Sequence, residues 1–98
     1  MIISYGQDDR VCAYTSLVAM LETKNMTRTA CCLLVDKEEI GSVGATGMQS
    51  RFFENAVAEI LNLLGQYSDL TLRRCLANCK TLSSDVTSAY DALYKGSF

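Results

Sequence analysis

Acidic residues form three groups that could bind a cation: Asp8-Asp9, the adjacent pair Glu38-Glu39, and Asp85. Adjacent carboxylates repel each other, and burying one without a partner is costly. On an extended or loop backbone, however, the two side chains of an adjacent pair point in different directions. One carboxylate can then bind a cation while the other takes a proton from a water molecule. The pattern therefore indicates metal-assisted hydrolysis as one chemistry open to this chain.

The same residues also have a plainer interpretation. The acidic side chains could be solvated loop residues, and Asp8 or Asp9 could serve only as the N-cap of a helix. A carboxylate at that position accepts hydrogen bonds from backbone N–H groups of the first turn. Spacing alone does not separate this interpretation from a metal site.

The chain contains no histidine and no proline. The lack of histidine excludes a Ser-His-Asp triad, a Cys-His dyad and imidazole metal ligands. Five cysteines stand at positions 12, 31, 32, 75 and 79. An odd number without a secretion signal argues against a disulfide framework, so we expect reduced, mostly buried thiols.

The composition is that of one small globular domain or a piece of a larger one, with 98 residues and 49% hydrophobic residues. The net charge of −2 argues against nucleic-acid binding. The longest apolar run, Ala30–Val35, is far shorter than the ~20 residues that span a bilayer. The N-terminus also has no signal-peptide pattern. We therefore expect a cytoplasmic protein with no membrane partner.

Three segments carry apolar residues at helical spacing, at about residues 8–23, 51–64 and 69–80. Gly65 is expected to end the second helix, and Asp69 is expected to cap the third. This spacing also places Cys75 and Cys79 on one helix face.

Strands are predicted at residues 1–5, 29–35 and 81–86, with a glycine-containing loop at 36–50. That loop lacks the Gly-Lys-Ser/Thr ending of a phosphate-binding loop, so its glycines are expected to let the backbone turn around a site. Strands alternating with helices predict an α/β layer structure. Because ligands gather beyond the carboxyl ends of strands in such sheets, the three acidic groups are expected to converge there.

Three stretches resemble one known family. Residues 6–14, GQDDRVCAY, resemble the segment with the bridging aspartate in the aspartyl aminopeptidase/aminopeptidase I family of dizinc metallopeptidases. Residues 34–42, LVDKEEIGS, continuing through 47–55, GMQSRFFEN, resemble its Glu-Glu segment, most closely in the bacterial aminopeptidase I branch. Residues 83–86, SSDV, resemble a third ligand segment. The resemblance covers roughly residues 4–91, and the tail after it no longer looks like the family.

This resemblance implies a site that cleaves the first peptide bond of a peptide. Asp8 would bridge two metal ions, usually zinc, with Co²⁺ or Mn²⁺ as alternatives. Glu38 would be the general base that deprotonates a water molecule, and Glu39 and Asp85 would be terminal metal ligands. The fold implied is a zinc-peptidase-like three-layer α/β catalytic domain, of which residues 1–98 would be an internal fragment.

The chain departs from the family in lacking its two histidine ligands. We therefore expect weak metal binding, at most trace peptidase activity from the chain alone, and marginal stability. Self-association through open strand edges or apolar helix faces is also expected. Two other interpretations stay open: a non-enzymatic remnant that acts as an interaction or structural module, and an unrelated small α/β binding domain.

Overall fold

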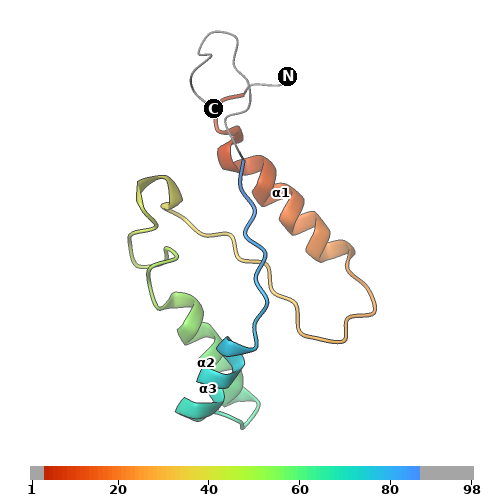
Figure 1. Cartoon of the computed structure of the whole chain (residues 1–98), viewed down its shortest axis with the longest axis vertical. Coiled ribbons are helices and arrows are strands. Elements are labelled where there is room, and N and C mark those ends of the chain that lie inside the picture. The colour runs from red at the N-terminus through yellow and green to blue at the C-terminus, as the bar shows by residue number, and fades with distance from the viewer. Residues whose placement is uncertain (1–3, 87–98) are drawn as a thin grey trace. The chain divides into compact units, whose positions relative to one another are not determined.

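Three α-helices and one 3₁₀ turn make up the regular structure in the computed structural model, which describes residues 4–86 (Figure 1). The helices are α1 (Gln7–Glu22), α2 (Phe52–Leu63) and α3 (Asp69–Ala77), and the 3₁₀ turn is η1 (Glu38–Ile40). The chain divides into two compact units. The first unit contains Met1–Leu33 and Leu82–Phe98, and the second contains Leu34–Thr81. The three predicted helices are thus confirmed.

The first unit is built on α1, whose apolar residues remain largely exposed. None of the residues of α1 is buried. The exposed fraction is 68% for Tyr14 and 74% for Leu21, two members of the apolar stripe that the spacing predicts. The segment 82–86 belongs to this unit although it is distant from α1 in the sequence.

The start of α1 differs from the prediction. Gly6 occupies the N-cap position in a left-handed conformation with φ of 73°, and no side chain caps the helix. Asp8 and Asp9 follow it with non-helical backbone angles, and the peptide bond between them is cis. The expectation that Asp8 or Asp9 caps the helix was therefore wrong.

In the second unit, α2 packs against α3 around two buried leucines, Leu61 and Leu72. Gly65 ends α2, as predicted, because its φ of 72° reverses the chain where other residues would be strained. The N–H of Gln66 donates to the carbonyl of Leu61 at 2.9 Å, and the N–H of Gly65 donates to that of Asn62 at 3.0 Å. These two bonds form a Schellman motif, which satisfies carbonyls that the helix leaves free.

Ser68, not Asp69, caps α3. The backbone of Ser68 is extended, and its Oγ accepts a hydrogen bond from the N–H of Thr71 at 3.0 Å. Asp69 lies in the first turn and instead accepts a hydrogen bond from the Tyr67 hydroxyl at 3.0 Å. The helix ends at Ala77, three residues earlier than predicted, so Cys79 lies beyond it.

The predicted strands have no counterpart in the part of the chain that the structure describes. Residues 29–35 and 81–86 run without regular structure, and residues 1–3 of the expected first strand lie outside the described range. A strand requires a hydrogen-bonded neighbour, and none is formed among residues 4–86. The α/β catalytic domain therefore stays a prediction.

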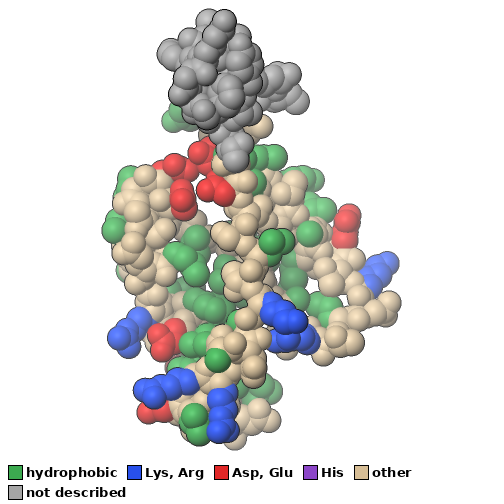
Figure 2. All heavy atoms as spheres, viewed as in Figure 1, with side chains coloured by type: hydrophobic (Ala, Val, Ile, Leu, Met, Phe, Trp, Pro, Cys, Tyr) green, Lys and Arg blue, Asp and Glu red, His purple; other side chains and the backbone are tan. Residues whose placement is uncertain are grey.

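Large apolar side chains lie at the surface of both units, and Figure 2 shows many of them on its visible face. Leu61 is buried, whereas Ile60 and Leu64, its neighbours in the predicted stripe of α2, are 57% and 64% exposed. The five cysteines are free, as expected, but none is buried. No helix within residues 4–86 has the length and apolar character needed to cross a membrane.

The N-cap of α3 can be tested by substituting Ser68. Ser68→Ala removes the hydroxyl that accepts from Thr71 and is expected to lower helix stability by about 1 kcal/mol. Ser68→Asp keeps an acceptor and is expected to stay within a few tenths of the unaltered chain. Urea unfolding followed by far-ultraviolet circular dichroism measures both variants. Equal losses in the two variants would contradict the cap.

Candidate metal centre

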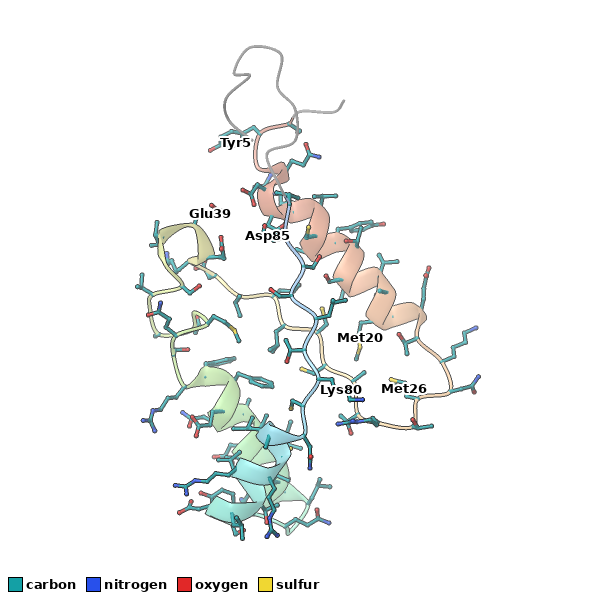
Figure 3. All side chains as sticks on the ribbon, in the orientation of Figure 1. Tyr5, Met20, Met26, Glu39, Lys80 and Asp85 are labelled. Carbon is teal, nitrogen blue, oxygen red and sulfur yellow. The ribbon has the colours of Figure 1, made fainter. Side chains whose placement is uncertain are left out.

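Three carboxylates come together in the first unit. Asp8, Asp9 and Asp85 each offer one oxygen, and these atoms all lie within 4.8 Å of one another. Figure 3 shows Asp85 beside the first turn of α1. Asp8 and Asp85 are exposed, whereas Asp9 is half-buried. The fold therefore joins two predicted ligands that are distant in the sequence, and it adds a third acidic residue that the family resemblance left without a role.

Asp9 is the most enclosed member of this cluster. Its Oδ1 exposes less than 1 Å² and has no hydrogen-bond partner. The Asp9 carboxylate also forms a hydrogen bond with Cys12, which raises the pKa of that thiol above its ordinary value of 9.0. A hydrogen bond between the Cys12 thiol and Ser84 lowers this pKa, by less than the bond to Asp9 raises it. The thiol therefore remains a proton donor to Asp9 at neutral pH.

The acidic pair of the second unit lies in η1. Glu38 and Glu39 form its first turn, after Lys37 adopts a left-handed conformation with φ of 67°. Glu38 is exposed, as a group that exchanges protons with water must be in part. The N–H of Ser42 donates to the carbonyl of Lys37 at 2.7 Å, which closes the turn around the pair.

The loop after η1 is held by hydrogen bonds and by one crowded glycine. The Gln49 side-chain amide donates to the carbonyl of Gly41 at 2.6 Å, and the Gln49 backbone N–H donates to that of Ser42 at 3.2 Å. Gly47 is buried, and a Cβ at this position would lie 2.5 Å from the carbonyl oxygen of Ser42. Only glycine fits there, so Gly47 and Gln49 fix the loop that carries Glu38 and Glu39.

The structure places the four predicted site residues in two units. Asp8 and Asp85 lie together in the first unit, and Glu38 and Glu39 lie together in the second. That both pairs meet at one centre stays a prediction. The sequence placed Asp9 with Asp8 in one of the three acidic groups expected to converge, but the family resemblance gave a role to Asp8 alone.

A zinc ion fits the donor set of the first unit in part. Carboxylate oxygens are accepted zinc ligands, although histidine and cysteine are commoner. The Oδ1 of Asp9 is enclosed and has no hydrogen-bond partner among the described residues, and a bound cation is one group that would satisfy it. No other group of acidic or cysteine residues within residues 4–86 has the spacing of a metal site.

Comparison with known proteins gives matches over nearly the whole chain. The family model described as "Aminopeptidase I zinc metalloprotease (M18)" matches residues 1–98. The match includes the tail, so the expectation that the resemblance ends near residue 91 was wrong. No solved structure matches the chain.

Several curated proteins named "Probable M18 family aminopeptidase 1" are similar to the chain. The protein of Clostridium acetobutylicum is 61% identical over 94 residues, which are 96% of this chain and 20% of the relative. The Thermotoga maritima protein is 43% identical over 96 residues, covering 97% and 21%. The Borrelia garinii protein is 41% identical over 97 residues, covering 96% and 21%. The chain thus spans about a fifth of the length of these relatives.

Gly47→Ala tests whether the loop at residues 37–51 depends on close backbone contact. The new methyl group would collide with the carbonyl of Ser42, and the displacement is expected to cost about 1–3 kcal/mol. Hydrogen exchange measured by mass spectrometry should show faster exchange in peptides that contain η1. Thr46→Ala, one residue away, is the control and should exchange as the unaltered chain does. Unchanged exchange in Gly47→Ala would contradict the steric argument.

The raised pKa of Cys12 predicts a pH-dependent reactivity. Iodoacetamide alkylates only the thiolate. At about pH 9, Cys12 should therefore react more slowly than a thiol with an ordinary pKa. Asp9→Asn removes the charged acceptor, so the pKa should fall and alkylation should become faster. Mass spectrometry of the Cys12 peptide gives the rate, with Cys31 of the same chain as the reference for the reagent. A slower rate in Asp9→Asn would show that the hydrogen bond does not control this thiol.

Proposed function

The chain belongs to the aminopeptidase I zinc metalloprotease (M18) family, and we propose that it supplies carboxylates of the metal centre in an aminopeptidase. The proposed reaction is hydrolysis of the first peptide bond of a peptide, which releases the N-terminal residue. The chain spans about a fifth of the length of its curated relatives. We therefore propose the activity for a catalytic domain that includes these residues, not for these residues alone.

One observation carries this proposal. The carboxylates of Asp8 and Asp85 approach within 4.8 Å although the residues stand near opposite ends of the described chain. Two negative charges at this distance repel each other, so a solvated surface would not gain from bringing them together. A cation between them removes that cost. The residues that meet are also the two that match the family's ligand segments in the first unit.

The proposed roles are those that the resemblance to the family implies for each carboxylate. Asp8 would be the ligand shared by two zinc ions, and Asp85 and Glu39 would each be a ligand of one of them. Zinc supplies a Lewis acid that makes a water molecule a stronger acid and polarises a carbonyl group. Glu38 would take the proton from that water and later give it to the leaving amine.

The second unit supports the role of Glu38 through its rigidity. A general base must hold its carboxylate within hydrogen-bond reach of water, so the backbone beneath it must be fixed. The bonds from Gln49 and Ser42, together with the crowded Gly47, fix this backbone. Glu38 itself remains exposed and free to exchange protons with solvent.

The missing histidines define what this chain does by itself. With carboxylates as its only ligands in this region, it would hold zinc weakly, because each missing ligand leaves a position to water. We propose that the chain alone is inactive and that other parts of an M18 catalytic domain supply the remaining ligands. Co²⁺ or Mn²⁺ would serve as alternative ions.

A second function is supported by the exposed apolar residues of α2. Leu63 is 84% exposed and Ile60 is 57% exposed, on a helix that buries only Leu61. Such a surface favours self-association or docking onto another protein. In this alternative, the chain is an interaction or structural module in which the carboxylates have no catalytic role.

A chimera separates the two functions. This chain would replace the matching residues of the Clostridium acetobutylicum relative, and turnover of an aminoacyl nitroanilide and zinc content would be measured. We expect an active chimera, in which Glu38→Gln lowers kcat by about 10²–10⁴-fold while zinc content is retained. Asp85→Ala should lower both kcat and zinc content.

The matched control for Glu38→Gln is Glu59→Gln, which removes an exposed carboxylate of α2 in the same unit. Its turnover should equal that of the chimera. Full activity in Glu38→Gln would refute the assignment of the general base. An inactive chimera that binds no zinc would favour the interaction module instead.

A further inference from the structure

The turn that carries Glu38 and Glu39 needs support from another part of the chain. The 3₁₀ turn η1 is three residues long, and a turn of that length has few hydrogen bonds of its own. The residues that enclose it, Lys37, Gly41 and Ser42, have positive φ angles of 67°, 94° and 59°. This conformation is unfavourable for residues with a Cβ, such as Lys37 and Ser42, so it persists only where the surrounding structure holds it.

The bonds that precede the turn do not supply this support. The Asp36 carboxylate accepts a hydrogen bond from the N–H of Lys37 at 2.9 Å, and its other oxygen lies 3.6 Å from the Lys37 ammonium. Both side chains are more than half exposed, so this ion pair contributes little. Because these bonds join adjacent residues, they do not tie the turn to the rest of its unit.

Gln49 ties the turn to the start of α2. Its side-chain amide donates to the carbonyl of Gly41 at 2.6 Å, across a separation of eight residues, and its backbone N–H donates to that of Ser42 at 3.2 Å. One residue thus holds both left-handed residues that follow η1. Gln49 is itself held in place, because the hydroxyl of the next residue, Ser50, donates to the carbonyl of the buried Gly47 at 2.6 Å.

The bond from the Gln49 side chain leads directly to the main chain of Glu38. Gly41, which accepts from the Gln49 amide, donates its own N–H to the carbonyl of Glu38 at 3.0 Å. Two hydrogen bonds therefore connect the amide with the backbone of Glu38. Since that backbone sets where the carboxylate lies, its displacement would move the carboxylate away from the water molecule. A misplacement of about 1 Å can lower a rate by about 10²-fold.

We propose that Gln49 is a positioning residue for Glu38, whose carboxylate it holds in place through the hydrogen bond from its side-chain amide to Gly41. The proposal rests on the proposed function, since it requires Glu38 to be the general base. Gln49 contacts neither metal nor substrate in this role. Its amide should therefore affect the catalytic step through Glu38 alone.

The first experiment uses the chimera with the Clostridium acetobutylicum relative. Gln49→Met keeps the length of the side chain and the backbone N–H but removes the amide donor. We expect kcat per bound zinc to fall about 10–100-fold, with KM little changed. Gln66→Met is the matched control, because it alters an exposed glutamine of the same unit. Its kcat should equal that of the chimera.

A double variant shows whether Gln49 acts through Glu38. In the Glu38→Gln chimera the positioned carboxylate is already absent, so adding Gln49→Met should lower kcat by less than about twofold. An equal fold loss with and without Glu38→Gln would refute the proposal. A loss of turnover only in proportion to lost zinc would refute it as well.

The second experiment uses the chain alone and does not depend on activity. Hydrogen exchange of the Gly41 amide is measured by nuclear magnetic resonance, because this N–H donates to the carbonyl of Glu38. Gln49→Met should make this exchange about fivefold faster or more, whereas Gln66→Met should leave it unchanged. Circular dichroism of both variants checks that the helices are retained. Unchanged exchange in Gln49→Met would refute the link between Gln49 and η1.

The outcomes distinguish this inference from the proposed function. If Glu38→Gln lowers turnover while Gln49→Met does not, the role of Gln49 is refuted and the proposed function stands. If Glu38→Gln keeps full turnover, or if the chimera is inactive, the proposed function fails and the positioning role of Gln49 fails with it.

Discussion

Repulsion between like charges is the constraint that shapes the first unit. Asp8, Asp9 and Asp85 bring three carboxylates within 4.8 Å, and nothing in their own chemistry favours that approach. Gly6 turns into α1 with a left-handed conformation and Asp8 and Asp9 depart from helical angles, so the backbone sets the directions of these two carboxylates. The segment 82–86, which belongs to the same unit as α1, brings Asp85 to them despite that repulsion.

Burial imposes a second constraint on both units. Leu61 and Leu72 are the buried hydrophobic residues of the described range, while the apolar side chains of α1 stay at the surface. With so little apolar area removed from water, the helices gain little stability from packing. The chain therefore carries more apolar surface than it covers by itself, and the relatives that it matches are about five times as long.

The sequence predicts features whose causes are local. Helical spacing identifies α1, α2 and α3, and Gly65 marks the end of α2 because a left-handed residue is needed there. The sequence does not predict which of two neighbouring residues caps α3. Ser68 and Asp69 are both favourable N-cap residues, and only the backbone geometry distinguishes them. Local sequence also does not decide whether residues 29–35 and 81–86 form strands, because a strand forms only when a neighbouring strand pairs with it. The resemblance to the family predicted that Asp8 and Asp85 lie close together. The burial of the Asp9 Oδ1 depends on tertiary packing, which a short sequence motif does not predict.

The short connection between α2 and α3 also has a consequence for the order of folding. The hydrogen bonds of the Schellman motif at Gly65 and of the cap at Ser68 each join residues that are close in the sequence. Forming them therefore closes only short loops and costs little chain entropy. The approach of Asp85 to Asp8 instead closes a loop of nearly the whole described chain. Contacts between near neighbours form faster than distant ones. The helix pair should therefore be in place early, while the acidic cluster assembles last and opens first.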